Sequence, residues 1–243
     1  MSYCVAMQLN NGLIFMSDTR TNAGFDNISQ FCKLFTFEKK GKRFITLLAA
    51  GNLATTQSVL SLLEERNKAP SESGFSLMEA PSMFQVARLV GDTLREVIQR
   101  NSDVGQKADA TFHATFIVGG QINGSETRLF LIYPEGNFIE ANSDTPYFQI
   151  GETKYGRPIL LRAYDAEMSW EEAIKLLLIS FDSTVKANLS VGLPLDMQIY
   201  QNDSFDCLHR KRINAEDPYF VNVSQGWGNA LKSAFNKLPD FKL

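Results

Sequence analysis

The sequence predicts an α+β fold in four layers, with two antiparallel β-sheets packed against each other and helices outside them. Segments with alternating apolar residues come in groups, and the helical segments between these groups come in pairs. Such segregated runs favour a layered α+β domain over alternating βαβ units. The chain has 243 residues, of which 44% are hydrophobic, and this is enough for one large core. Because no linker or internal repeat interrupts the sequence, we expect a single domain over residues 1–243.

The first group of expected strands begins almost at the N-terminus. Alternation of apolar and polar residues predicts four strands, at residues 3–9, 13–17, 33–37 and 43–50. Asn10, Asn11 and Gly12 tolerate positive φ and predict a tight hairpin between the first two strands. Chain ends usually fray unless something ties them down. A strand that starts at the third residue therefore indicates an N-terminus that is held in place.

Two pairs of helices and further strands complete the expected order. The helices are predicted at residues 52–66, 82–99, 170–186 and 223–237. Asn52 can cap the first helix, and Ser169 with Glu172 forms a capping box in front of the third. The remaining strands are predicted at 111–118, 128–133, 138–141, 147–150, 193–200 and 207–213, and loops at 22–27 and 67–76. The apolar faces of the first two helices exceed the needs of one core, so we expect them to mediate contacts between copies.

Charge and hydropathy argue against two classes of partner. The net charge is −3, and the basic runs at 39–43 and 209–212 are short enough to be solvated surface, so nothing indicates nucleic-acid binding. No window approaches the roughly 18 uninterrupted apolar residues of a membrane span, and the start lacks the cationic region of a signal peptide. Cys4, Cys32 and Cys207 have unrelated spacings, which fits reduced, mostly buried thiols. We therefore expect a cytoplasmic protein.

The common catalytic and cofactor motifs do not occur in the sequence. It has no HExxH or paired CxxC, no GxxxxGK[ST] or GxGxxG loop, and no GxSxG elbow. We expect neither a metal nor a cofactor. The two histidines are His113, which we interpret as a structural residue within a strand, and His209. A hydroxyl nucleophile in this chain would therefore need a different general base.

Ser2 offers such a base once Met1 is removed. A small residue at position 2 favours removal of the initiator Met, and removal would give Ser2 a free α-amine. An α-amine has an ordinary pKa of about 7.7–8.0, against roughly 10.4 for lysine, so it can accept a proton near neutral pH. Activation of a hydroxyl by the chain's own terminal amine is a covalent strategy of enzymes, and it requires a rigidly held N-terminus.

Several motifs downstream of Ser2 resemble the proteasome β-type family of N-terminal nucleophile hydrolases. The sequence SDTR (17–20) ends the second expected strand, Lys33 opens the third, and the fourth ends in AAG (49–51) before a helix. The segments DTRTNAG and DNISQFCK are similar to a bacterial homologue of that family. The resemblance extends over essentially the whole chain, down to NLSVGLP (188–194), and implies the αββα sandwich of proteasome subunits.

The resemblance implies roles for five residues and a pocket. Ser2 Oγ would attack a carbonyl with its own amine as base, Lys33 would lower the pKa of that hydroxyl, and Asp18 would hold Lys33 charged. Arg20 would order the surrounding loop, and the Gly51 N–H would stabilise the oxyanion. The residues that fall where the family lines its substrate pocket are Thr21, Cys32, Ala49 and Leu53. They predict a small, largely apolar pocket.

Three departures from the family pattern concern the nucleophile and the groups around its amine. The nucleophile is Ser instead of Thr, and it lacks the methyl group that restricts χ1. The Gly-Ser-Gly of the family becomes Ile150, Gly151 and Glu152. The distal Asp-x-x-Ser-Gly becomes ANLSVG (187–192), in which Ser190 fits the serine and no acid stands at the expected place.

The function that the resemblance implies is hydrolysis of peptide bonds in a self-assembled ring or open-ring particle. The substrate would be a polypeptide or peptide, and the sequence does not identify an unfoldase partner. Two alternatives use the same sequence features differently. One is an amidohydrolase or peptide-bond-forming enzyme for a dedicated small substrate, and the other is a catalytically silent assembly subunit.

Overall fold

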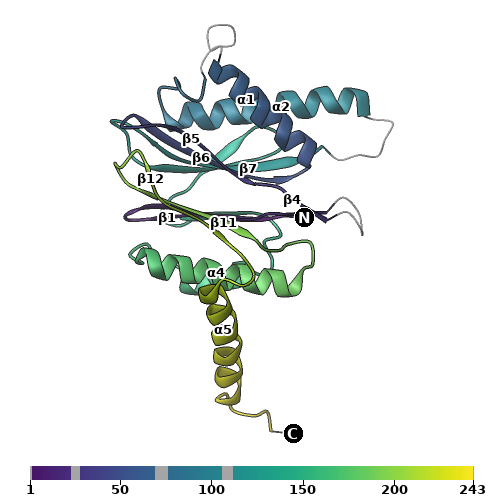
Figure 1. The fold of residues 1–243 in the computed structure, drawn as a ribbon, viewed down its shortest axis with the longest axis vertical. Helices are drawn as coiled ribbons and strands as arrows, with labels where there is room; N and C mark the ends of the chain where they lie inside the picture. The colour runs from purple at the N-terminus through teal and green to yellow at the C-terminus, as the bar shows by residue number, and fades with distance from the viewer. Residues whose placement is uncertain (1, 23–27, 69–75, 106–111, 243) are drawn as a thin grey trace.

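A computed structural model of the chain describes residues 2–22, 28–68, 76–105 and 112–242. Two five-stranded antiparallel sheets lie face to face, and helices cover the outer face of each sheet (Figure 1). The four-layer α+β fold expected from the sequence is confirmed. The helix α5 projects away from the sandwich and ends near the C-terminus (Figure 1).

The strands divide between two sheets and a small ribbon. The first sheet has the order β10-β1-β2-β11-β12, with β1 (Tyr3–Leu9), β2 (Gly12–Asp18), β10 (Tyr147–Gly151), β11 (Leu195–Gln201) and β12 (Cys207–Ile213). The second has the order β5-β6-β7-β8-β9, with β5 (Leu34–Lys39), β6 (Arg43–Gly51), β7 (Ala114–Ile122), β8 (Arg128–Ile132) and β9 (Phe138–Glu140). The ribbon pairs β3 (Arg20–Asn22) with β4 (Ile28–Gln30).

Each sheet has helices on its outer face. The helices are α1 (Leu53–Lys68) and α2 (Met83–Gly105) on the second sheet, with α3 (Arg157–Ala163) and α4 (Trp170–Ala187) on the first, followed by α5 (Pro218–Asn236). The expected capping box is present at Ser169, whose hydroxyl accepts the Glu172 N–H while the Glu172 carboxylate accepts the Ser169 N–H. This pairing satisfies two N–H groups that a helix start leaves without partners.

The first strand is held along both of its edges. In β1, Cys4 pairs with Ser17 of β2 on one side and with Ile150 of β10 on the other. Alternate residues of β1 enter different layers, because Tyr3 and its period-two neighbours pack against α4 while Cys4 packs between the two sheets. The N-terminal strand is therefore an interior strand, and its first residues lie in the core.

The expectation that the apolar faces of the first two helices serve assembly is wrong. Val59 and Leu63 of α1 and Val90 and Leu94 of α2 are fully buried against the second sheet. The sheet needs this cover because its outer face carries apolar side chains such as Phe116. The two helices thus use their apolar faces within the chain.

The structure adds two elements to the expected order and moves the start of a third. The short helix α3 and the ribbon β3–β4 were not predicted, because neither is long enough to show a periodic pattern. The last helix begins at Pro218, five residues before the predicted start at 223, because Asp217 caps it by accepting the N–H groups of Tyr219 and Phe220. The interpretation of His113 as a strand residue is also wrong, since β7 begins at Ala114 and His113 is exposed.

Most of the two predicted loops at 22–27 and 67–76 lies outside the described residues. Within the described ranges, no helix combines the length and the apolar character that crossing a membrane requires.

Gly151 provides a test of how the N-terminal strand is seated. A Cβ atom at Gly151 would lie 1.9 Å from the Ser2 carbonyl oxygen, and the residue has φ +83°. Gly124 has φ +84° with nothing within 4 Å of such an atom, so it is a matched control for backbone strain alone. We expect Gly124→Ala to cost about 1 kcal/mol of unfolding free energy, and Gly151→Ala to cost at least about 2 kcal/mol more, because the strand must move. Chemical denaturation measures both, and equal losses would contradict the close approach.

Candidate active site

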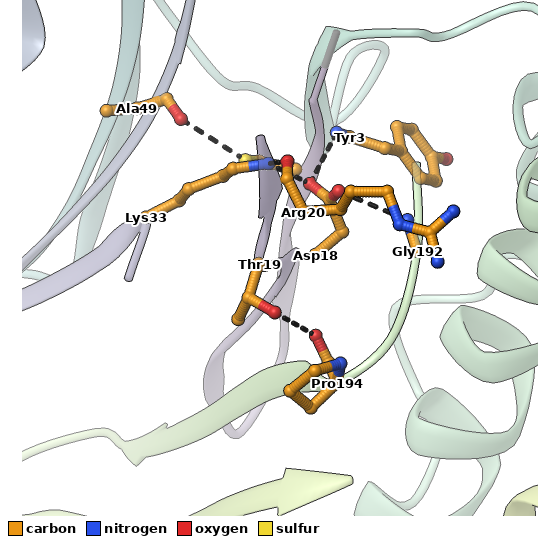
Figure 2. Close-up of polar contacts among 9 residues, drawn as sticks. Tyr3, Asp18, Thr19, Arg20, Lys33, Ala49, Gly192 and Pro194 are labelled. Carbon is orange, nitrogen blue, oxygen red and sulfur yellow. Dashed lines mark hydrogen bonds and ion pairs between the residues drawn. The ribbon is translucent and has the colours of Figure 1, made fainter. Parts of the chain in front are cut away.

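The carboxylate of Asp18 lies at the end of β2, where separate segments of the chain meet (Figure 2). Its side chain is fully buried. Oδ1 accepts the N–H of Tyr3 at 2.9 Å, and Oδ2 accepts the N–H of Gly192 at 3.3 Å. Burial raises the pKa of this carboxyl above its ordinary value, and the Lys33 ammonium and the two N–H groups oppose that rise. Asp18 therefore ties the start of β1 to the loop before β11.

Lys33 lies directly before β5 and reaches across to the end of β2 (Figure 2). Its Nζ lies 2.6 Å from Asp18 Oδ1 and 2.6 Å from the carbonyl oxygen of Arg20. The Lys33 side chain is 7% exposed. A buried lysine is stabilised in its charged form by such a partner, so this arrangement fixes an ammonium in the space between the two sheets.

Thr19 and Arg20 connect the end of β2 with the loop at 188–194. Thr19 Oγ1 donates to the carbonyl oxygen of Pro194 at 2.8 Å, and Arg20 Nη1 donates to that of Leu189 at 2.8 Å. Gly192 lets the guanidinium approach, because a Cβ atom there would lie 2.3 Å from Arg20 Cζ. Arg20 thus contacts the loop that the sequence analysis expects it to order.

Ser2 stands at the entry to β1 and lines the same pocket as Lys33. Its carbonyl oxygen accepts the backbone N–H of Glu152 at 2.7 Å. The following residue is held by Asp18 through the Tyr3 N–H. Two neighbouring strands therefore fix the backbone at the position where a nucleophile at the N-terminus would need to be rigid.

The pocket beside Ser2 has a volume of about 440 Å³. Its wall includes seven of the predicted site and pocket residues, namely Ser2, Lys33, Gly51, Thr21, Cys32, Ala49 and Leu53. Asp18, Arg20 and Ser190 are not among the residues that line it. Asp18 and Arg20 instead act on Lys33, through a carboxylate oxygen and a carbonyl oxygen respectively.

One side of the pocket was missed by the sequence analysis. Gln57, Leu60, Ser61 and Glu64 of α1 line it, together with Phe31, Phe35, Ala50 and Thr56. The spacing of Leu53, Gln57, Leu60 and Glu64 is typical of one helix face, so extending the helix pattern from Leu53 would have found them. The wall combines apolar with polar and charged groups, and the expectation of a largely apolar pocket is wrong for the side that α1 provides.

Ser190 lies in the loop after α4, where the side chain of Asn188, the residue directly after the helix, holds the backbone. Its N–H donates to Asn188 Oδ1 at 2.9 Å, and Asn188 Nδ2 donates to Glu152 Oε2 at 2.8 Å. Two departures from the family pattern, Glu152 and Asn188, are therefore hydrogen-bonded to each other in the structure. The structure gives the Ser190 hydroxyl no hydrogen bond with a described residue.

The three cysteines differ in exposure. All three cysteines are free, and the expectation of mostly buried thiols is wrong for Cys32, which is exposed at the pocket, while Cys207 is half-buried. Cys4 is buried, and its thiol donates to the carbonyl oxygen of Ala49 at 3.5 Å (Figure 2). In the described ranges, no three His, Cys, Asp or Glu side chains are placed to hold a metal ion.

Comparisons with known proteins show where this arrangement belongs. A family model described as "Proteasome subunit" matches residues 2–193. The solved structure of a Gly-1 mutant of Anbu from Hyphomicrobium sp. strain MC1 is 50% identical, covers all of both chains and has a TM-score of 0.91. The Anbu (ancestral beta-subunit) of Yersinia bercovieri is 51% identical over 99% of both chains, with a TM-score of 0.91. A structure of the Anbu complex from Pseudomonas aeruginosa is 44% identical over 99% of this chain and 98% of that one, with a TM-score of 0.92.

A search of curated proteins found no match. The family model covers most of the chain, and each of these solved structures is far above the identity at which a shared family is secure. The chain therefore belongs to the proteasome family, and over its whole length it is similar to Anbu proteins.

Proposed function

We propose that the chain is an N-terminal nucleophile hydrolase that cleaves amide bonds of a peptide or polypeptide and works in the cytoplasm as a self-assembled particle. The observation that carries this proposal is the buried ion pair of Lys33 with Asp18, because its lysine lines the same pocket as Ser2. A fixed cation beside a hydroxyl favours the alkoxide over the alcohol. The same pair on a protein surface would have no such effect.

The proposed reaction uses the groups at the N-terminus of the mature chain. With Met1 removed, the Ser2 amine takes the proton of Oγ as Oγ bonds to the substrate carbonyl carbon. The amine then returns that proton to the leaving nitrogen as the amide C–N bond breaks. Water hydrolyses the resulting ester in a second cycle of the same kind. Lys33 stabilises negative charge on Oγ, and the Gly51 N–H is the proposed oxyanion donor, for which a typical contribution is roughly 3–4 kcal/mol.

The pocket wall supports a peptide substrate whose side chain combines an apolar part with a polar group. Phe31, Phe35 and Leu60 offer apolar contact, while Glu64 and Gln57 offer hydrogen-bond acceptors on the α1 side. The alternative of a dedicated small substrate uses the same pocket, and a comparison of peptides with small amides separates the two. A silent assembly subunit would leave Ser2 unreactive toward both.

The support for self-assembly comes from exposed apolar residues at the C-terminal end of the chain and not from α1 and α2. The distal half of α5 and the residues after it expose Leu231 (50%), Phe235 (75%), Leu238 (67%) and Phe241 (87%). A groove of about 330 Å³ lies beside it, and its wall contains Ile159, Leu176, Ile179 and Trp227 among others. Exposed apolar residues of this size in a soluble chain indicate a contact surface. Leu231 also forms part of the wall of this groove, so we propose that Phe235, Leu238 and Phe241 of one copy fill the groove of a second. The Pseudomonas aeruginosa relative is described as a helical assembly.

The first prediction concerns the terminus. The active form should lack Met1, because only a free α-amine on Ser2 has a pKa near neutral pH. Intact mass of the protein from its native host measures this directly. If every active preparation retains Met1, the amine cannot be the base and the proposed mechanism is wrong.

The second prediction concerns the buried ion pair. Lys33→Ala should lower turnover of a short fluorogenic peptide, or labelling by a peptide epoxyketone, by roughly 10²–10⁴-fold. Lys33→Arg should not restore activity, because a planar guanidinium is bulkier than the ammonium that fits between Asp18 and the Arg20 carbonyl. Because these groups act together, Ser2→Ala combined with Lys33→Ala should be no slower than Ser2→Ala alone.

Lys211→Ala is the matched control, since it removes a lysine from a more exposed ion pair with Asp217. That variant should keep wild-type activity. Thermal unfolding and light scattering must show that the Lys33 variants are folded and assembled. Near-wild-type labelling in such a Lys33→Ala protein would contradict the assigned role.

The third prediction concerns assembly. Wild-type protein at micromolar concentration should scatter light as a particle well above the chain mass of 27.2 kDa. The double variant Leu231→Glu, Phe235→Glu should shift the distribution toward the monomer, because one carboxylate would line the apolar groove and the other would have to enter it. Leu208→Glu is the control, at a residue on β12 that is 48% exposed, and it should leave the distribution of particle sizes unchanged. A stable, active wild-type monomer would overturn the proposal.

A further inference from the structure

Glu152 is a buried residue whose backbone contacts Ser2, and its carboxylate forms no ion pair with a cationic side chain in the described part of the chain. The residue is 5% exposed, and its backbone N–H donates to the Ser2 carbonyl oxygen at 2.7 Å. Its Oε2 accepts a hydrogen bond from Asn188 Nδ2 at 2.8 Å. Among the residues that the structure describes, no lysine, arginine or histidine forms an ion pair with it.

Such a carboxylate is unfavourable unless a charge balances it. A carboxylate loses hydration when it is buried, and a hydrogen bond from one neutral amide does not replace that hydration. In the chain as translated, the nitrogen of Ser2 is a neutral amide. Removal of Met1 turns this nitrogen into an ammonium, and it does so in the residue whose carbonyl oxygen accepts the backbone N–H of Glu152.

We propose that Glu152, oriented by Asn188, is the counter-ion and positioning residue for the α-ammonium that Met1 removal creates on Ser2. The inference rests on the function proposed above, which requires the free amine, and it adds the group that holds this amine in place. Asn188 is suited to orient the carboxylate, because its other side-chain atom, Oδ1, is fixed by the Ser190 N–H. The acid that the family pattern places in the distal motif is then replaced here by the Glu152 carboxylate.

Several charged or titratable groups act on the amine from the elements around it. Lys33 lies before β5 and lowers the pKa of the amine, while Asp18 at the end of β2 offsets part of that effect. Cys32 and Glu64 line the pocket from the segment before β5 and from α1. Glu152 raises the pKa of the amine, because a nearby negative charge stabilises the ammonium. It therefore makes the amine a stronger proton acceptor next to the Lys33 cation.

The first test measures the pKa of the Ser2 amine in protein whose intact mass shows that Met1 is absent. Competitive acylation with trace acetic anhydride over a range of pH, followed by mass spectrometry of the N-terminal peptide, gives this value. Glu152→Gln should lower the pKa of the amine by about 1, and the rising limb of the pH–rate profile should move to lower pH by the same amount. Glu167→Gln removes an exposed carboxylate outside the pocket and should change the amine pKa by no more than about 0.3.

The second test measures stability before and after Met1 removal. Protein made with methionine aminopeptidase inhibited retains Met1, and treatment with the purified aminopeptidase removes it. In wild type, removal should raise the melting temperature, and in Glu152→Gln this gain should disappear. The contribution of Glu152 raises the pKa of the folded-state amine. The gain should therefore be complete below the ordinary amine pKa of about 7.7–8.0 and be lost as the pH rises through the raised value.

Glu152→Asp keeps the charge, so this variant should retain most of the amine pKa that Glu152→Gln loses. If Glu152→Gln does not fold, the pH dependence of the stability gain in wild type is the measurement, and a gain that does not fall as the pH rises through the amine pKa would overturn the inference. An unchanged amine pKa in folded, processed Glu152→Gln would overturn this inference and leave the proposed function intact. Retention of Met1 in active protein would instead overturn the proposed function.

Discussion

The buried carboxylate of Asp18 is the contact on which the rest of the site depends. It holds the Tyr3 N–H of β1, the Gly192 N–H of the loop before β11 and the ammonium of Lys33 before β5. Replacing such a pair by apolar residues is often neutral or stabilising, whereas removing one partner of a buried pair typically costs 3–5 kcal/mol. A contribution to stability therefore does not explain why this ion pair is buried here. Its role is better explained by the positions in which it holds the N-terminal strand and Lys33.

Most of the fold could be predicted from the sequence because the informative signals are local, whereas the predicted part of the pocket came from the family resemblance. Strand alternation, the Asn-Gly turn and the Ser169 capping box each depend on a few neighbouring residues, and each matches an observed element. The short elements α3 and β3–β4 lack that periodicity and were missed. The early start of α5 depends on a single capping residue, Asp217, which a search for apolar periodicity does not weigh.

The part of the site that could not be predicted depends on contacts between distant segments. Glu152 and Asn188 appear in the sequence as two unrelated departures from the family pattern, 36 positions apart, and they are hydrogen-bonded in the structure. Likewise, the excess apolar character of α1 and α2 gave no sign of how much of the second sheet they would have to cover. Ser2 could be proposed in advance from its chemistry and Lys33 from the family resemblance, but the partners that hold them belong to the tertiary structure.

The helix α5 leaves the sandwich after its last strand, and the family model ends at residue 193, before β11 begins. The strands, the Asp18 contacts and the pocket do not use the exposed apolar residues at its end. Substitutions there can therefore accumulate without disturbing the residues around Ser2. In evolutionary terms, selection can therefore act on the contact proposed for these residues separately from the pocket around Ser2.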